Sequence, residues 1–341
     1  VIVPEQFTMQ TQRQLVDLSE NKAIMNIDVL SFKRLAYRVF DELGITNLTV
    51  LEETGKNLVL RKLAAQEADK LGIIGRNLNR IGYISEVKSL LSELVQYNIS
   101  PEELGRYIAS GRLSDTLSDK LKDVLVLYEA FEKFMQDKYI TAEEILNVLS
   151  NVAEESAILR NSVIAFDEFT GFTPIQNQLI KKLFVISKKI YVTLTIDCRE
   201  DIFKSRGMQE LFDMPKRTVK SLTEMAAFYG IEVEEPIILD KNYRLAENEE
   251  LSFMEQQLFR KRRGSFKKAP KHIHIDCLRD PKQELTKIAR RINELVRNEN
   301  LRYRDIAIVT GDVNIYAGYV REIFDKYNIP YFIDATQAVS Y

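Results

Sequence analysis

The chain contains the segment Val163-Ile-Ala-Phe-Asp-Glu-Phe-Thr-Gly-Phe-Thr-Pro174, in which an apolar run stops at two carboxylates and a helix start follows. An uninterrupted apolar run of this length is typical of a buried parallel strand. Thr173, Pro174 and Gln176 supply an N-cap, a first-turn proline and a capping-box partner for the next helix. Open α/β sheets bind ligands beyond the carboxyl ends of their strands. The segment therefore predicts an α/β protein with Asp167 and Glu168 at a ligand-binding edge.

The rest of the first 260 residues alternates in the same way, with one interruption. Strands are expected at 1–4, 24–32, 162–166 and 189–196, and helices follow the first three of them, which indicates parallel strands with crossover helices. Between about 51 and 150 the pattern is helical only, with capping boxes at Ser100 and Thr141. One helix there shows a buried stripe at spacings of three and four: Leu121, Val124, Tyr128, Phe131 and Met135. The pattern predicts one sheet interrupted by an all-helical insertion.

A second α/β run follows a basic segment that is broken by Gly and Pro. Residues 260–270 have the composition of a solvated linker, with contact to DNA phosphates as the alternative. Beyond it we expect strands at 272–277, 305–309 and 331–333, and helices at 283–297 and 315–327. The predicted organisation is a first α/β domain that is interrupted, a linker and the start of a second α/β domain, with boundaries at 1–50, 51–160, 161–260, 261–271 and 272–341.

Composition narrows the class of protein. The 341 residues are 45% hydrophobic and 29% charged, and no apolar run reaches the length of a membrane helix. Cys198 and Cys277 have no spacing for a metal site or a disulfide framework, which favours a reducing cytoplasm. A net charge of −2 excludes a uniformly basic nucleic-acid binder, so any such binding must be local. The chain starts without methionine, and we expect it to be a piece of a longer protein.

Six segments, taken together and in order, resemble the AddB family, the B subunit of the AddAB helicase-nuclease that processes broken DNA ends. They cover nearly the whole chain, and it is their order that is specific. They are Val3-Pro-Glu-Gln6-Phe-Thr8, Val29-Leu-Ser-Phe32-Lys-Arg34-Leu-Ala-Tyr37, Gln96-Tyr-Asn-Ile-Ser-Pro-Glu-Glu103, Phe169-Thr-Gly-Phe-Thr-Pro174, Tyr303-Arg-Asp-Ile-Ala-Ile308 and Ile329-Pro-Tyr-Phe-Ile-Asp334.

The resemblance implies a RecA-like parallel sheet of the superfamily 1 helicase type, its helical insertion and part of a second RecA-like domain. It also implies an AddA-type partner subunit in a heterodimer, ATP with Mg²⁺, and a nuclease domain with a 4Fe-4S cluster beyond the C-terminal residue. A phosphate-binding loop would precede Val1. The pair Gly55 and Lys56 is followed by Asn57 rather than Ser or Thr, so it is not that loop. We therefore expect no ATP hydrolysis by this chain alone.

The family scans single-stranded DNA for the Chi recombination signal. Aromatic faces stack on extruded bases, while Gln and Arg bond to base edges. The family's Chi-contacting positions fall on Gln6, Thr8, Phe32, Arg34, Tyr37 and Phe169. A tryptophan is common in the family at the position of the tyrosine, so sequence preference stays open. Each of these residues also has a structural alternative. Gln6 and Thr8 could be a strand exit and a helix cap, and Arg34 and Tyr37 could be an amphipathic surface pair. Phe32 and Phe169 could belong to the core.

Three further residues match nucleotide-site positions of helicases. Asp167 and Glu168 could coordinate Mg²⁺ and position an attacking water, although the family more often has glycine at position 168. A polar strand end is the alternative. Arg244, within Asn242-Tyr-Arg244, resembles the helicase arginine that reaches a γ-phosphate, and a surface salt bridge explains it equally well.

Three functions therefore stay open. The first is the DNA-binding, Chi-scanning part of an AddB-type subunit of an ATP-dependent helicase/deoxyribonuclease in double-strand-break repair and recombination. The second is an active superfamily 1 helicase motor, which ATPase activity independent of a partner would favour. The third is a degenerate helicase scaffold that only binds the partner subunit, and it predicts no DNA binding at the strand tips.

Overall fold

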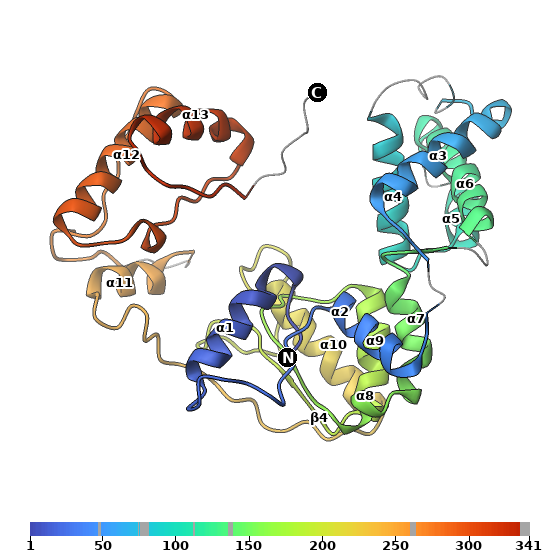
Figure 1. Cartoon of the computed structure of the whole chain (residues 1–341), viewed down its shortest axis with the longest axis horizontal. Coiled ribbons are helices and arrows are strands. Elements are labelled where there is room, and N and C mark those ends of the chain that lie inside the picture. Colours follow the sequence, from blue (N-terminus) through green and yellow to red (C-terminus); the bar gives the residue numbers. More distant parts are fainter. Residues whose placement is uncertain are drawn as a thin grey trace. The chain divides into compact units, whose positions relative to one another are not determined.

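The structure is a computed structural model, shown in Figure 1, and it describes residues 1–46, 49–73, 75, 82–111, 113–135, 139–259 and 264–334. The chain divides into two compact units, residues 1–240 and 241–341. The division falls ahead of the predicted linker, so that the segment 241–260 groups with the second unit. No helix in the ranges above combines the length and hydropathy needed to cross a membrane.

The first unit is built on a small parallel sheet. Strand β3 (Val163–Phe166) pairs in parallel with β4 (Lys189–Val192). Ile2 forms parallel bridges to both Leu30 and Phe166, so the spatial order is Leu30, Ile2, β3, β4. The α/β class with parallel strands is thus confirmed for this unit.

The first, second and fourth predicted strands are shorter than expected, and in the segment 1–4 only Ile2 forms a bridge. In the segment 24–32 only Leu30 pairs with the sheet, and Met25 is 94% exposed. The neighbouring segment around Ile2 turns into a 3-10 helix after Pro4. The residues of 24–32 other than Leu30 therefore have no extended backbone beside them to pair with. β4 ends at Val192, opposite the last residue of β3.

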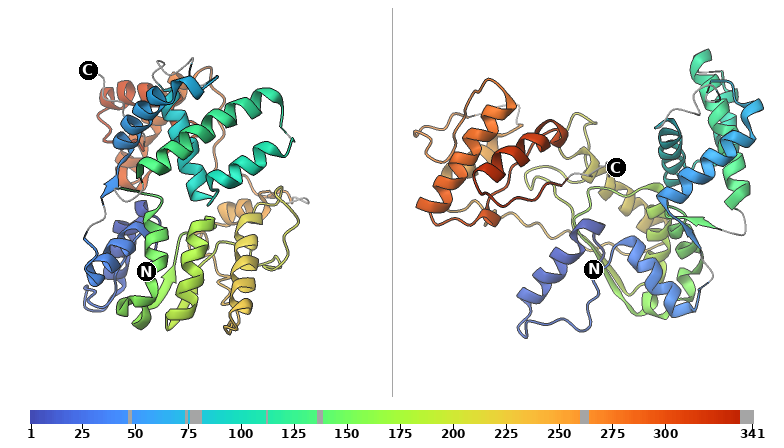
Figure 2. Two further views of the ribbon diagram at one scale, coloured as in Figure 1. Left: turned by 90° about the vertical axis from the view of Figure 1, so that its right-hand side faces the viewer. Right: turned by 45° about the horizontal axis from the view of Figure 1, so that its top comes forward.

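Among the described residues, eight helical elements belong to the sheet-containing part of this unit. Capping explains two of the starts, because Ser31 accepts a hydrogen bond from Arg34 N and the predicted capping box of Thr173 and Gln176 forms. The eight elements are η1 (Glu5–Phe7), α1 (Thr8–Leu18), α2 (Phe32–Leu43), α7 (Ile145–Val152), η4 (Ala153–Glu155), α8 (Ala157–Asn161), α9 (Pro174–Ile186) and α10 (Asp213–Phe228). Figure 2 shows the short strands with green and yellow helices beside them, and the dark-blue α1 projecting away.

The core of this part joins the sheet to its helices. Apolar residues of α2, α7, α8, α9 and α10 pack on Ile2, Ile164 and Phe166. Helices α7 and α8, which the sequence grouped with the helical insertion, contribute Ile145, Leu149 and Leu159 to this core. Packing on a sheet face, rather than position in the chain, decides which core a helix joins.

The helical lobe has a core of its own. It consists of α3 (Glu53–Gln66), η2 (Ala68–Lys70), α4 (Tyr83–Gln96), α5 (Pro101–Ala109) and α6 (Asp115–Met135). The predicted stripe of α6 is confirmed for Val124, Tyr128, Phe131 and Met135, which are buried, whereas Leu121 at its start is only half-buried. The capping box at Ser100 also forms, with Glu103 as its partner. At Thr141 the two predicted capping bonds form with Glu144, and helix α7 begins at the next residue.

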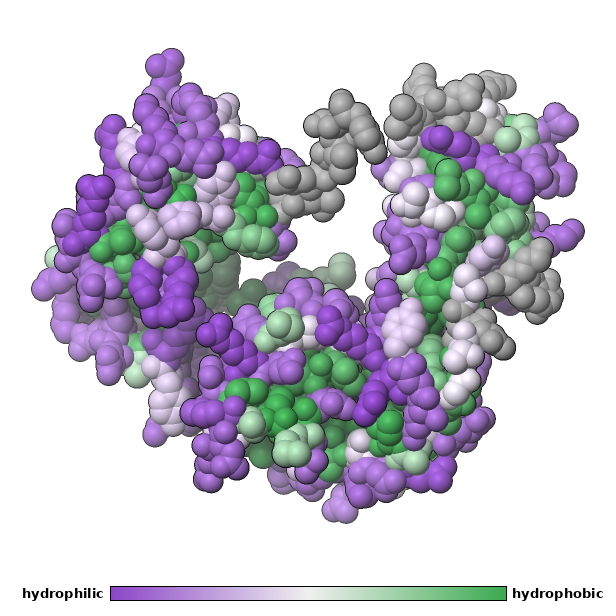
Figure 3. All heavy atoms as spheres, in the orientation of Figure 1, coloured by the Kyte–Doolittle hydropathy of each residue, from purple (hydrophilic) through white to green (hydrophobic). Residues whose placement is uncertain are grey.

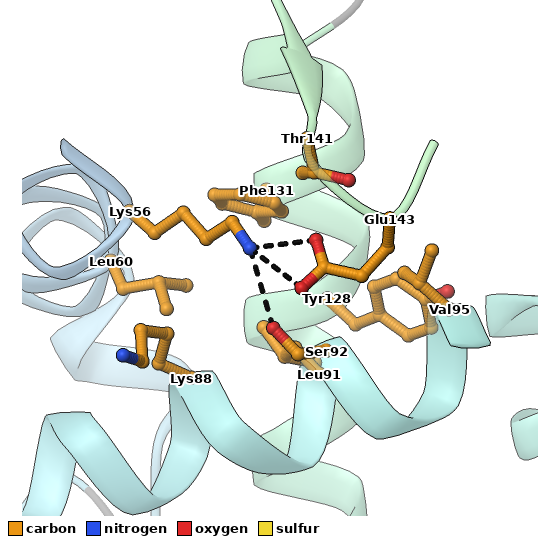
Figure 4. Close-up of a pocket in the computed structure, with 10 residues that line it drawn as sticks. All are labelled: Lys56, Leu60, Lys88, Leu91, Ser92, Val95, Tyr128, Phe131, Thr141 and Glu143. Carbon is orange, nitrogen blue, oxygen red and sulfur yellow. Dashed lines mark hydrogen bonds and ion pairs between the residues drawn. The ribbon is translucent and has the colours of Figure 1, made fainter. Parts of the chain in front are cut away.

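A short neck joins the helical lobe to the sheet. β1 (Val50–Leu51) and β2 (Ile140–Thr141) pair in parallel, so the outgoing and returning chains run side by side. Beside this ladder the ammonium of Lys56 donates to both carboxylate oxygens of Glu143, at 2.9 and 2.6 Å, and to Glu53 at 2.9 Å. Figure 4 shows the lysine pointing from α3 to Glu143, with Ser92 of α4 below. The Gly-Lys pair of the sequence is therefore a structural element of the neck.

The second unit contains α11 (Glu249–Gln257), α12 (Pro281–Asn298), η5 (Tyr303–Asp305) and α13 (Val313–Lys326). α12 and α13 match the two predicted helices and share a core of Leu285, Ala289, Ile292, Ile323, Phe324 and Ile329. The three strands predicted at 272–277, 305–309 and 331–333 are not formed by the described residues of this unit. A strand needs a second strand to pair with. Among the described residues no strand pairs with these segments, and Ile275 and Val309 are each 93% exposed.

Glu250 fixes the start of the segment after the predicted linker. Its carboxylate, in a residue only 7% exposed, accepts hydrogen bonds from the backbone N–H groups of Lys271, His272 and Ile273. Burial alone would raise the pKa of Glu250, but the three N–H groups outweigh it and the pKa is lowered. The residues following Pro270 are thus tied to α11. Hydrophilic side chains cover much of the surface visible in Figure 3, with apolar residues between them.

Candidate nucleic-acid interface

The candidate site lies at the carboxyl edge of the parallel sheet in the first unit. The chain order of the parallel segments reverses between the segment around Ile2 and β3, because Leu30 lies on one side of Ile2 and β3 on the other. Open α/β sheets bind ligands beyond the strand ends at such a switch point. Two loops flank it: η1 with Glu5 and Gln6, and the loop 167–173 with Asp167 and Phe169.

Glu5 connects the tips of the first two parallel segments. Its Oε1 accepts from Nε of Arg34 at 2.9 Å, and its Oε2 accepts from the hydroxyl of Ser31, the N-cap of α2. The Ser31 hydrogen bond, followed by that of Arg34, lowers the pKa of Glu5. Both members of the ion pair stay accessible, with side-chain exposures of 51% for Arg34 and 55% for Glu5. The pair therefore presents an oriented guanidinium to solvent.

The other two early residues have different environments. Gln6 is exposed in η1, next to Glu5. Thr8 is 3% exposed, and its hydroxyl donates to the carbonyl of Glu5 at 3.0 Å. Thr8 thus holds the turn that presents Gln6 and Glu5 and has little surface of its own.

The two predicted phenylalanines belong to one aromatic cluster. Phe32 lies 5.8 Å from Phe166, 5.5 Å from Phe169 and 6.4 Å from Phe172, as measured between ring centroids. Phe32 is 7% exposed, whereas Phe169 is half-buried. Phe32 meets Phe169 and Phe172 edge to face, and such pairs add roughly 0.5 to 1.5 kcal/mol each beyond burial. The cluster brings α2 and the loop 167–173 together, and Phe169 is the ring that keeps accessible surface.

Tyr37 lies one turn beyond Arg34 on the same face of α2. Its side chain is exposed, with the residue 39% accessible. The ring packs edge-on against Phe40, with the centroids 6.3 Å apart. Gln6, Arg34, Tyr37 and Phe169 are therefore accessible to a ligand, whereas Thr8 and Phe32 support them from below.

The acidic pair sits at the end of β3. Asp167 N donates to the carbonyl of Ile2 at 3.0 Å, and its carboxylate accepts from the hydroxyl of Thr193 at the end of β4. Glu168 is exposed and has a φ of 63°, the left-handed region. Glycine adopts this conformation without strain. Glycine would therefore fit the backbone at position 168 with less strain than glutamate does.

The nucleotide-site residues do not form a complete site in this chain. Asp167 and Glu168 supply carboxylates, but the sequence contains no phosphate-binding loop to place a nucleotide against them. No cluster of three or more acidic, histidine or cysteine ligands occurs within the described ranges. Arg244 is an exposed residue of the second unit. A 4Fe-4S cluster needs four thiolates, and the chain has two cysteines, so its residues do not fit that group.

The basic segment falls partly outside the described residues, since 260–263 lie in a gap. Of the described part, Lys268 pairs with Glu249 of α11. The interpretation of this segment as a solvated linker, with contact to DNA phosphates as the alternative, stays a prediction.

Glu5 and Ser31 are the residues that sequence reasoning missed. The signal was present, because an acid in the first turn after one parallel segment and a helix-capping serine after the next must meet at the same edge. Aromatic and basic residues drew attention as nucleic-acid contacts, while the acid that orients the arginine did not.

Comparison with known proteins agrees with the resemblance found in the sequence. The family described as "ADDB, N-terminal" matches residues 1–255. The B subunit of the ATP-dependent helicase/deoxyribonuclease of Lachnoclostridium phytofermentans is 38% identical over 339 residues, 98% of this chain and 30% of the relative. The B subunits of the same name from Clostridium tetani and Clostridioides difficile are each 33% identical, over 98% of this chain and 29% of the relative. The chain thus spans about 30% of the length of these relatives, and it belongs to the AddB N-terminal family.

Proposed function

We propose that this chain binds single-stranded DNA along the carboxyl edge of its first sheet, as the N-terminal part of an AddB-type subunit that scans DNA for a Chi-type signal. One observation carries the proposal: Gln6, Arg34, Tyr37 and Phe169 are accessible at this edge, and they come from three segments far apart in the sequence. Aromatic faces and hydrogen-bonding side chains in one place are the composition of a single-strand site.

Each accessible residue has a role that its chemistry suits. Tyr37 and Phe169 stack on bases, because every base offers a π-face. Arg34 and Gln6 bond to base edges, and Arg34 is oriented for this by Glu5. Thr8 and Phe32, which are buried, hold the turn and the aromatic cluster in position. The site thus combines stacking, which tolerates all sequences, with two side chains that discriminate between bases.

The proposal extends to the whole protein and to its domains. We propose that the segments 1–46 and 145–240 are parts of a first RecA-like domain, that the helical lobe between β1 and β2 is its insertion, and that the second unit begins a second RecA-like domain. In the complete protein this part would work with an AddA-type subunit, which supplies translocation, in the processing of DNA ends for recombinational repair. The relatives are named as one subunit of a helicase/deoxyribonuclease, which supports a partner subunit.

The test is the affinity of the chain for fluorescein-labelled single strands, measured by fluorescence anisotropy at several salt concentrations. Arg34→Ala should weaken binding by roughly 1 to 3 kcal/mol at a preferred sequence, and Tyr37→Ala should weaken binding of all sequences. Arg160→Ala is the matched control, because Arg160 is an exposed arginine of α8, just before the amino end of β3. Equal affinities for all three variants and the unchanged chain would favour the scaffold function.

The same preparation distinguishes the motor function. We propose that this chain alone does not hydrolyse ATP, since no phosphate-binding loop occurs in its sequence. Phosphate release above background, abolished by Asp167→Ala, would contradict this and favour a helicase motor.

A further inference from the structure

Arg34 is held by one of its three side-chain nitrogens. Nε donates to Glu5 Oε1 at 2.9 Å, and this is the single hydrogen bond that the side chain makes to the described residues. The N–H groups of the two terminal nitrogens therefore remain available to donate to a ligand. A guanidinium fixed through Nε presents its terminal nitrogens as a planar fork, which forms two parallel hydrogen bonds with a pair of acceptors.

Glu5 is itself fixed from a second direction. The hydroxyl of Ser31 donates to its other carboxylate oxygen, and Ser31 also accepts from Arg34 N at 3.3 Å, closing a ring of three residues. The start of α2 lies beside this carboxylate, and a helix N-terminus favours a negative charge. These contacts lower the pKa of Glu5 and keep it ionised near neutral pH. Glu5 is thus a rigid anionic support for the arginine.

The charge of Glu5 affects phosphates and bases differently. A free arginine attracts any DNA phosphate, whatever the sequence. A carboxylate next to the guanidinium cancels most of this attraction and repels the phosphate directly. A neutral base edge is not repelled, and guanine offers the O6 and N7 acceptors that match the arginine fork.

We propose that Glu5 is a specificity-determining positioning residue: it holds Arg34 through Nε, discourages phosphate contact and leaves the terminal nitrogens to select guanine in single-stranded DNA. The inference rests on the proposed single-strand function and deepens it. Arg34 contacts the guanine, and Glu5 acts on the selection only through Arg34.

The experiment measures two quantities for each variant by fluorescence anisotropy. The first is the preference of the chain for an oligothymidine with a central guanine over one with 7-deazaguanine, which lacks the N7 acceptor. The second is the slope of log affinity against log salt for oligothymidine alone. Glu5→Gln and Glu5→Ala should reduce a preference of roughly fivefold to less than twofold. They should also strengthen oligothymidine binding and steepen the slope by roughly 0.7, because the released arginine neutralises a further phosphate.

Two controls separate positioning from a structural role. Glu154→Ala removes an exposed acid that pairs with Lys182, at comparable side-chain exposures of 59% and 46%, and should change neither quantity. Glu5→Asp keeps the charge and should restore part of the preference. Thermal unfolding followed by circular dichroism checks that each variant is folded, and a purely structural role would lower stability without steepening the slope.

The outcomes also separate this inference from the proposed function. If Arg34→Ala weakens binding while the Glu5 variants keep the guanine preference and the salt slope unchanged, the positioning role is wrong and single-strand binding stands. If the unchanged chain does not bind single strands, both fail together.

Discussion

The neck and the sheet edge each contain an ion pair between a basic residue on a helix and a glutamate, and the two pairs differ in burial. At the neck, the Lys56 side chain is 3% exposed and that of Glu143 12%. At the edge, Arg34 and Glu5 are each about half exposed. A buried pair fixes structure, because removing one partner strands a charge. An exposed pair contributes little to stability and leaves its hydrogen-bonding groups free for a ligand.

The largest effect is expected at the neck. Lys56→Ala should lower the free energy of unfolding by roughly 3 to 5 kcal/mol, because Glu143 is left without its main partner. Urea denaturation followed by circular dichroism measures this. The double variant Lys56→Met with Glu143→Met should recover most of the loss, since it leaves no stranded charge. If Lys56→Ala lowers the free energy of unfolding by less than about 1 kcal/mol, the neck pair contributes no more to stability than an exposed ion pair does.

A second pair of variants compares a buried ring with an exposed one at the sheet edge. Phe32→Leu should lower the free energy of unfolding by about 1 to 2 kcal/mol, through lost aromatic contacts, and change single-strand affinity less than twofold. Tyr37→Leu should leave stability within about 0.5 kcal/mol and weaken single-strand binding roughly fivefold or more. Denaturation and anisotropy on the same samples check both. The reverse pattern would make Phe32 the stacking ring.

Glu168 allows a smaller test of strain at the edge. Glu168→Gly should raise the free energy of unfolding by about 0.5 to 1 kcal/mol, because glycine takes the observed positive φ without strain. The gain is smaller than the relieved strain, since glycine also increases the conformational entropy of the unfolded chain. Glu168→Ala, measured in the same urea titration, keeps the strain and should change little. Equal stability of all three chains would show that the left-handed conformation costs nothing here.

The smallest effect concerns the acid dependence of the edge pair. The pKa of Glu5 is lowered from 4.5 by Ser31 and Arg34, so its contribution to stability is fully present above 4.5 and is lost as pH falls through the lowered value. The stability difference between the unchanged chain and Glu5→Gln should be below about 1 kcal/mol at neutral pH and should shrink toward acid. Unfolding midpoints between neutral pH and pH 3 measure this difference. A difference that grows toward acid would mean that folding raises the pKa of Glu5 instead of lowering it.

The parts predicted well from the sequence are those that local rules determine. The apolar run before Asp167, the capping box at Thr173 and the stripe on α6 each depend on neighbouring residues, and each element forms. Burial follows less closely, because Val163 is 57% exposed and Leu121 is only half-buried. Strand lengths depend on partners elsewhere in the chain, which explains why only Leu30 of the segment 24–32 pairs with the sheet. The strands expected beyond residue 271 need partners that the described residues do not supply.

The candidate site follows the same division. Topology alone was enough to bring the loops after Ile2 and β3 to one edge. Which side chains stay accessible was not predictable, because it depends on packing between α2 and the loop 167–173. That packing buries Phe32 and leaves Phe169 half-exposed. The ring of Glu5, Ser31 and Arg34 depends on side-chain geometry across two segments and on the bend after Pro4.

The parallel pairing at the neck has a consequence for how the chain folds. Ile2 must find Phe166 across the whole helical lobe, and contacts between distant residues are slow to form because a long loop has to close first. Once β1 and β2 pair, the loop that contains the helical lobe is already closed. The segments that bring Ile2 to Phe166 then have a much shorter effective loop to close. We therefore expect the helical lobe to fold early and the sheet late, so that a weakened neck slows refolding of the sheet even though no residue of the sheet has changed.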